Sequence, residues 1–140
     1  MRWKGFRPEV EVEVLEDKRE VIIIVDDDAT NLAIGRTALE DDYEVFTAMS
    51  GDKLFRILDR VLPDMILLDI EMPSMGGYDV MRKLKRSEHL MGIPVVFISG
   101  NTDAKSQTEA LNLGAVGYII KPLTREMLVE VISEQLKYAN

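Results

Sequence analysis

The sequence contains no cysteine, one histidine and one tryptophan among its 140 residues. Without cysteine, neither a disulfide scaffold nor a thiolate metal site can form. No apolar run approaches the ~20 residues that a membrane-spanning helix needs. The basic start MRWKGFR is followed by PEVEVEV instead of the apolar core of a signal peptide. These absences predict a cytoplasmic protein that does not enter a membrane.

Positive charge is also scarce, because 17 Lys and Arg stand against 25 Asp and Glu and the formal net charge is −8. A nucleic-acid surface needs clustered Lys and Arg, so the composition argues against direct nucleic-acid binding. Apolar residues are plentiful at 46%, which is ordinary for a globular protein. A chain of this length suits one domain with a sizeable core.

Residues 1–19 differ in pattern from residues 20–140, which we expect to form the folded domain. The strict alternation in PEVEVEV leaves an added edge strand open. We favour an extended or disordered leader, because chain termini are usually loose unless tied down and repeated glutamates discourage edge pairing.

Short apolar runs alternate along the chain with segments of helical periodicity, as at Leu54, Ile57, Leu58 and Val61. Strands that alternate with helices predict βαβ units and a parallel sheet of the α/β class. Continuously apolar runs predict strands that helices cover on both faces, whereas the more alternating YEVFT suits an edge strand. The runs are VIIIV (21–25), YEVFT (43–47), MILLD (65–69), PVVFI (94–98) and GYII (117–120).

Polar residues follow four of these predicted strands. In open α/β sheets, ligands bind beyond the carboxyl ends of the strands, and adjacent parallel strands bring those ends to one edge. We therefore expect the exit residues to lie close together. They are Asp26-Asp27-Asp28, Asp69, Ser99 and Lys121.

Such a cluster of carboxylates requires a cation. Two carboxylates roughly 4 Å apart repel by ~4 kcal/mol at an effective dielectric constant of about 20, so Asp26, Asp27 and Asp69 together could cost up to ~12 kcal/mol. That penalty rivals the ~5–15 kcal/mol stability of a whole domain. Lys121 supplies one positive charge. A divalent metal is the other candidate, and oxygen ligands without cysteine indicate Mg²⁺ or Mn²⁺.

The motifs VDDD, LLDIEMP, FISG and GYIIKP, in this order at strand ends, resemble the receiver domain of two-component response regulators. The resemblance covers residues 20–138. It implies a flavodoxin-like, doubly wound sheet of five parallel strands in the order 2-1-3-4-5, with helices on both faces. It also implies a signalling phosphoacceptor, not an enzyme that acts on a separate substrate.

The resemblance assigns a role to each site residue. Asp69 would accept a phosphoryl group from a sensor histidine kinase or a phosphotransfer protein, and the switch would alter a surface for an effector or output domain. The resemblance also leaves a homodimer possible. However, the segment LNLGAVGY lacks the paired Asp that many winged-helix regulators carry near their dimer face. The implied metal ligands are Asp26, Asp27, Asp69 and the backbone carbonyl of Glu71, and the phosphate-binding and switch residues are Ser99, Lys121 and Tyr118.

Two other functions compete with this one. Asp26, Asp28 and Thr30 fit the DxDxT pattern of haloacid-dehalogenase-type phosphatases, but a further acidic motif after the lysine is missing and Asp69 would have no role. A degenerate receiver that serves only as a binding module is the second alternative, and the complete acidic set with Lys121 speaks against it.

Several residues have simpler interpretations. Asp28 is expected to cap the following helix. The side chain of Glu71 is read as an exposed loop charge. The pair Gly76-Gly77 is expected to let the chain turn into the third helix. The segment from Thr102 to Leu113 is only weakly amphipathic, so we expect a loosely held helix there.

Overall fold

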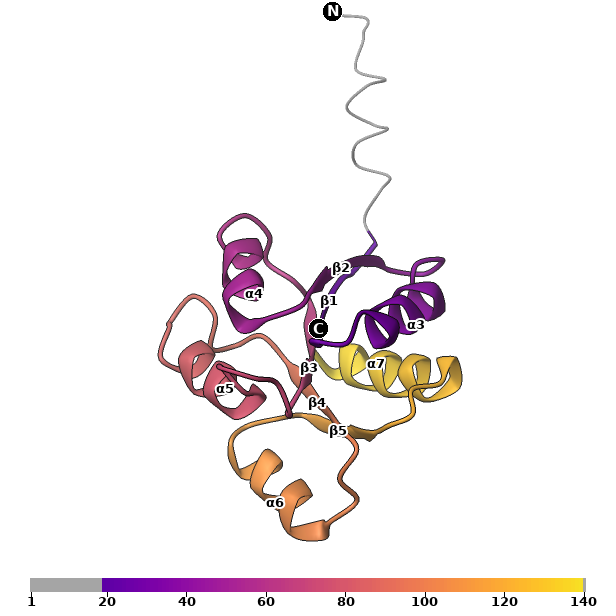
Figure 1. The fold of residues 1–140 in the computed structure, drawn as a ribbon. Helices are drawn as coiled ribbons and strands as arrows, with labels where there is room; N and C mark the ends of the chain where they lie inside the picture. Colours follow the sequence, from indigo (N-terminus) through magenta and orange to yellow (C-terminus); the bar gives the residue numbers. More distant parts are fainter. Residues whose placement is uncertain (1–18, 140) are drawn as a thin grey trace, which may run out of the picture.

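The computed structural model describes residues 19–139, in which five strands alternate with five helices (Figure 1). Residues 1–18, which make up nearly all of the expected leader, lie outside the described part. Among residues 19–139 no helix is both long and apolar enough to cross a lipid bilayer. The elements are β1 (Val21–Val25), α3 (Ala29–Leu39), β2 (Glu44–Ala48), α4 (Gly51–Leu58), β3 (Met65–Asp69), α5 (Gly77–Lys85), β4 (Val95–Ser99), α6 (Ala104–Asn112), β5 (Gly117–Ile120) and α7 (Arg125–Ala139).

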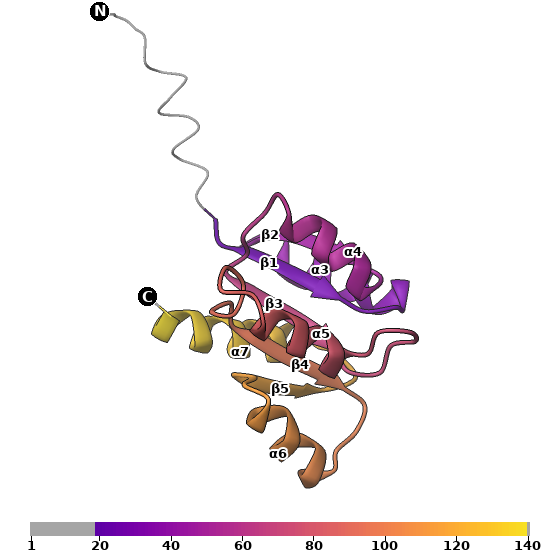
Figure 2. The same cartoon turned by 90° about the vertical axis from the view of Figure 1, so that its left-hand side faces the viewer.

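The strands form one parallel sheet in the order β2-β1-β3-β4-β5, which confirms the predicted topology and the edge position of the second strand (Figure 2). Strands β2 and β4 each begin one residue later than the sequence pattern suggested. The register pairs Val25 with Leu68, so Asp26 and Asp69 follow at neighbouring strand ends. Ser99 pairs with Ile120, which brings the next residue, Lys121, to the same edge.

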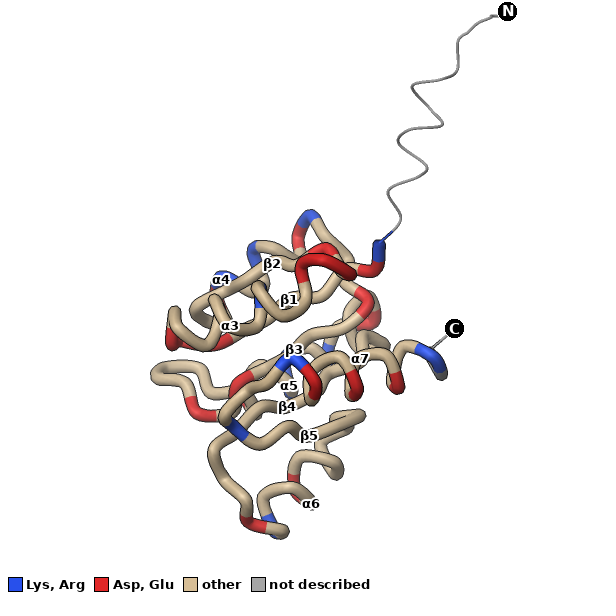
Figure 3. Tube along the Cα trace, turned by 90° about the vertical axis from the view of Figure 1, so that its right-hand side faces the viewer, with Lys and Arg blue, Asp and Glu red and all other residues tan. Residues whose placement is uncertain are grey.

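Helices cover both faces of the sheet, as the continuous apolar runs predict. Figure 1 shows α3 and α7 on one side and α4, α5 and α6 on the other. Successive strand residues point to opposite faces, so Ile22 and Ile24 pack under α3 and α7 while Ile23 and Val25 pack under the other three helices. The strands are almost free of charged residues, which lie mainly on the helices and loops (Figure 3).

Local capping fixes where several helices begin and end. The side chain of Asp28 accepts a hydrogen bond from the backbone N–H of Thr30 at 2.8 Å, which confirms the expected N-cap of α3. Gly114 lies two residues after the end of α6, and its φ of +104° suits a residue without Cβ. The N–H groups of Gly114 and Ala115 return to carbonyls of the last turn, which makes a Schellman cap.

Candidate functional site

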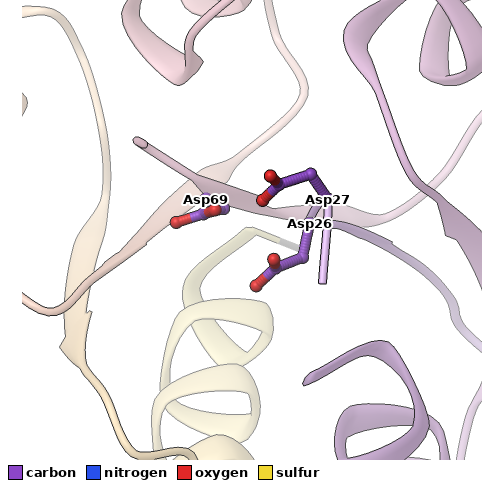
Figure 4. A group of neighbouring side chains, drawn as sticks. All are labelled: Asp26, Asp27 and Asp69. Carbon is purple, nitrogen blue, oxygen red and sulfur yellow. The ribbon is translucent and has the colours of Figure 1, made fainter. Parts of the chain in front are cut away.

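Three carboxylates converge where β1 and β3 end (Figure 4). One oxygen each from Asp26, Asp27 and Asp69 lies within 4.8 Å of the others. Asp26 and Asp69 are almost completely buried, at 0% and 1% exposure, whereas Asp27 faces solvent. The parallel register produces this arrangement, because Asp26 follows β1 directly and Asp69 is the last residue of the adjacent β3.

Lys121 brings positive charge to this cluster from the segment after β5. Its Nζ lies 3.2 Å from Asp69 Oδ1 and 3.6 Å from Asp26 Oδ2. Its backbone N–H donates to the carbonyl of Ser99 at 2.9 Å, which fixes the lysine beside β4. Burial disfavours its charge, but attraction to Asp69, Asp26 and Glu71 outweighs burial and the pKa of Lys121 is raised.

The two buried carboxylates differ in their hydrogen bonds. Asp26 accepts from the backbone N–H of Asp28 at 2.9 Å and from Asn31 Nδ2 at 3.2 Å. Neither oxygen of Asp69 accepts a hydrogen bond, although Lys121 lies at ion-pair distance. Burial, and then the charge of Asp26, raises the pKa of Asp69 to about 6 despite the opposing effect of Lys121, and Glu71 adds a further small increase.

This donor set fits a hard divalent cation. Three carboxylates face one ammonium group, so negative charge remains in excess. Buried oxygens without hydrogen-bond donors are costly unless a cation approaches them. Both Asp69 oxygens lack a hydrogen bond, and the Lys121 ammonium, 3.2 Å from Oδ1, compensates for only part of the negative charge. Clustered carboxylate oxygens without nitrogen or sulfur ligands are what Mg²⁺ and Mn²⁺ prefer.

Ser99 and Glu71 form a contact that sequence reasoning missed. The Ser99 hydroxyl, fully buried at the end of β4, donates to Glu71 Oε2 at 2.7 Å and accepts from the backbone N–H of Asn101 at 3.0 Å. The side chain of Glu71 is exposed, as expected, but it is not merely a loop charge. The two residues are 28 positions apart, so no local sequence signal announces their contact.

Tyr118 lies on β5 and its hydroxyl donates to the backbone carbonyl of Asn101 at 3.1 Å. Asn101 therefore bonds both Ser99, through its N–H, and Tyr118, through its carbonyl. Its side chain also contacts Ser106 and Asp103, so the same residue joins β4, β5 and the start of α6. Sequence reasoning gave Asn101 no role, because an Asn after a strand is ordinary turn chemistry.

Comparison with known proteins identifies the family. Residues 22–133 match the family model of the response regulator receiver domain. The chain is 39% identical over 108 residues to response regulator PleD of Caulobacter vibrioides, with 76% of this chain and 24% of PleD covered. It is 35% identical over 116 residues to a "probable cyclic di-GMP phosphodiesterase" of Vibrio cholerae, with 83% of this chain and 26% of that protein covered.

A solved structure gives the same result. The CheY-like response regulator receiver domain protein of Methanospirillum hungatei superposes with a TM-score of 0.78 at 28% identity, with 87% of this chain and 97% of that one covered. The chain belongs to the response regulator receiver domain family. It spans about a quarter of the length of the two curated relatives. Membership of the receiver family argues against the phosphatase alternative, and Asp28 caps α3 instead of joining the carboxylate cluster.

Proposed function

We propose that this receiver domain accepts a phosphoryl group on Asp69 from a sensor histidine kinase or a phosphotransfer protein, in a reaction that depends on Mg²⁺ or Mn²⁺. One observation carries the proposal: the buried carboxylate of Asp69, whose oxygens accept no hydrogen bond, lies beside the carboxylate of Asp26 and 3.2 Å from the ammonium of Lys121. Such an oxygen is available both as a metal ligand and as a nucleophile.

The chain's own groups account for most of the chemistry. With a pKa of about 6, Asp69 is mostly ionised at neutral pH. Its oxygen forms a bond to phosphorus as the bond from phosphorus to the donor's imidazole nitrogen breaks, and that nitrogen keeps the electron pair. Lys121 offsets the negative charge of nucleophile and phosphoryl group. A metal held by Asp26, Asp27, Asp69 and the Glu71 carbonyl would supply further charge neutralisation.

The remaining features follow from this role. The hydroxyl of Ser99, at the end of β4, would donate to a phosphoryl oxygen, and the Tyr118 side chain would change its position in response. The domain, residues 20–140, would act in the cytoplasm as a signalling phosphoacceptor, with residues 1–19 as its leader. It would signal through an effector or an attached output domain, without nucleic-acid binding of its own.

The test is phosphorylation by acetyl phosphate with Mg²⁺, followed by mass spectrometry of the intact protein and of its peptides. The wild type should gain one phosphoryl group at Asp69, and a chelator should prevent the gain. Asp69→Asn should not be labelled, whereas Asp52→Asn, an exposed carboxylate on α4, should behave as wild type. A wild type that stays unlabelled would favour the degenerate receiver, and an aspartate still labelled in Asp69→Asn would disprove the assignment.

A further inference from the structure

The hydroxyl of Ser99 is already engaged in the unphosphorylated protein. A serine hydroxyl has a single hydrogen to donate, and here it goes to the carboxylate of Glu71 over 2.7 Å. A hydroxyl–carboxylate bond of this length is charge-assisted and belongs to the stronger class of hydrogen bonds. Ser99 is fully buried, so bulk water does not compete for that hydrogen.

The proposed function asks the same hydroxyl to donate to a phosphoryl oxygen on Asp69, and it cannot do both. We infer that the Glu71 carboxylate is a positioning group that holds Ser99 in the unphosphorylated arrangement and must release it before the phosphorylated arrangement can form. This inference rests on the proposed function. It gives the Glu71 side chain a role separate from that of its backbone carbonyl.

Charge makes the release responsive to phosphorylation. Glu71 lies close enough to the cluster for its negative charge to affect the pKa values of both Asp69 and Lys121. A phosphoryl group on Asp69 adds negative charge that repels the Glu71 carboxylate and attracts the Ser99 hydroxyl. The modification therefore weakens the existing hydrogen bond and offers its donor a new acceptor.

The hydrogen bonds of Asn101 connect Ser99 to β5 and to α6. Its N–H donates to Ser99 Oγ at 3.0 Å, and its carbonyl accepts from the Tyr118 hydroxyl at 3.1 Å. Its side-chain amide donates to Ser106 Oγ at 3.1 Å, on α6. When Ser99 Oγ moves, the N–H of Asn101 loses its acceptor. The loop at Asn101, which is hydrogen-bonded to Tyr118 and Ser106, must therefore adjust.

The experiment compares Glu71→Ala, which removes the acceptor, with Glu71→Gln, which removes the charge but keeps an acceptor oxygen. Glu88→Gln, an exposed glutamate in the loop after α5, controls for net charge. Beryllofluoride, a phosphoryl mimic, is titrated at saturating Mg²⁺, with the Mg²⁺ affinity of each variant measured separately. Amide NMR shifts of Asn101 and Tyr118 follow the binding. Loss of one charge-assisted hydrogen bond should make Glu71→Ala bind about tenfold more tightly than wild type, with Glu71→Gln in between.

A second readout uses neither metal nor mimic. In the unmodified protein, Glu71→Ala should move the Asn101 amide shift away from its wild-type value, Glu71→Gln should move it less, and Glu88→Gln should leave it unchanged. In a Ser99→Ala background, Glu71→Ala and Glu71→Gln should bind the mimic equally, because there is no hydroxyl left to hold.

The outcomes separate this inference from the proposed function. Equal affinities for Glu71→Ala and Glu71→Gln in the protein that keeps Ser99 would overturn the inference, since loss of the Glu71 charge alone would then explain any gain. An unmoved Asn101 shift in unmodified Glu71→Ala would also overturn it. If the wild type is neither labelled at Asp69 nor able to bind the mimic, the proposed function fails, while the Asn101 shift still shows whether Glu71 holds Ser99.

Discussion

The buried carboxylate of Asp69 should make the stability of the metal-free protein depend on pH. Its pKa is raised from 3.8 to about 6 by burial and by Asp26. Between these two values the folded state binds more protons than the unfolded state, so the free energy of unfolding falls as pH rises from about 4 to about 6. A shift of about two units corresponds to a loss of ~3 kcal/mol. Urea unfolding in chelator at a series of pH values measures it.

The matched comparison is with Asp69→Asn, which cannot ionise at this position. The difference in unfolding free energy between the two proteins should grow across the same pH interval in favour of the variant and stay constant above it. Taking this difference removes the contribution of the other carboxylates, which titrate in both proteins. A difference that does not change with pH would show that Asp69 has an ordinary pKa.

Helix α5 holds the end of β3 in place through a close backbone approach. A Cβ on Gly77, the first residue of α5, would lie 2.5 Å from the carbonyl oxygen of Asp69 and 2.8 Å from the Cα of Ile70. Both atoms are backbone and cannot rotate away. Gly77→Ala should therefore destabilise the protein by about 1–3 kcal/mol and displace Asp69. Chemical unfolding and the rate of labelling by acetyl phosphate measure the two effects.

Gly92→Ala is the control, because a Cβ there would meet no atom within 4 Å. It should leave stability and labelling close to wild type. If both alanine variants lose similar stability, the close contact of Gly77 with Asp69 is not the cause. The sequence suggested that Gly76-Gly77 only eases the turn into the helix, and the structure adds the close packing.

The elements and the carboxylate cluster could be predicted because their signals are local. Continuous apolar runs mark buried strands, and the residues that follow them must meet at one edge of a parallel sheet. Strand bounds were predicted less accurately, because Tyr43 and Pro94 extend the two apolar runs one residue before β2 and β4 begin. The Glu71–Ser99 bond could not be predicted, because it depends on the side-chain rotamers of a loop residue and of the last residue of β4, 28 positions apart.

On the scale of the whole molecule, the charges of the site affect the stability of the entire domain, because the site is built on the ends of the core strands. The carboxylates at the ends of β1 and β3 repel each other. Among the residues that the structure describes, Lys121 is the one cation within ion-pair distance of Asp26 and Asp69. The same buried strands form the core on both faces. A cation that binds this edge in the native state alone therefore stabilises the entire domain.

Mg²⁺ should raise the melting temperature by mass action. At about ten times its Kd, the gain is ~1.4 kcal/mol, or roughly 4–6 °C for a domain of this size. Asp27→Ala should reduce this gain without harming the metal-free protein, because the Asp27 side chain is exposed and its loss relieves repulsion. Asp52→Ala should keep the full gain. Calorimetry at millimolar Mg²⁺ decides: an unchanged wild type, or equal gains in wild type and Asp27→Ala, would rule out a metal site built on these carboxylates.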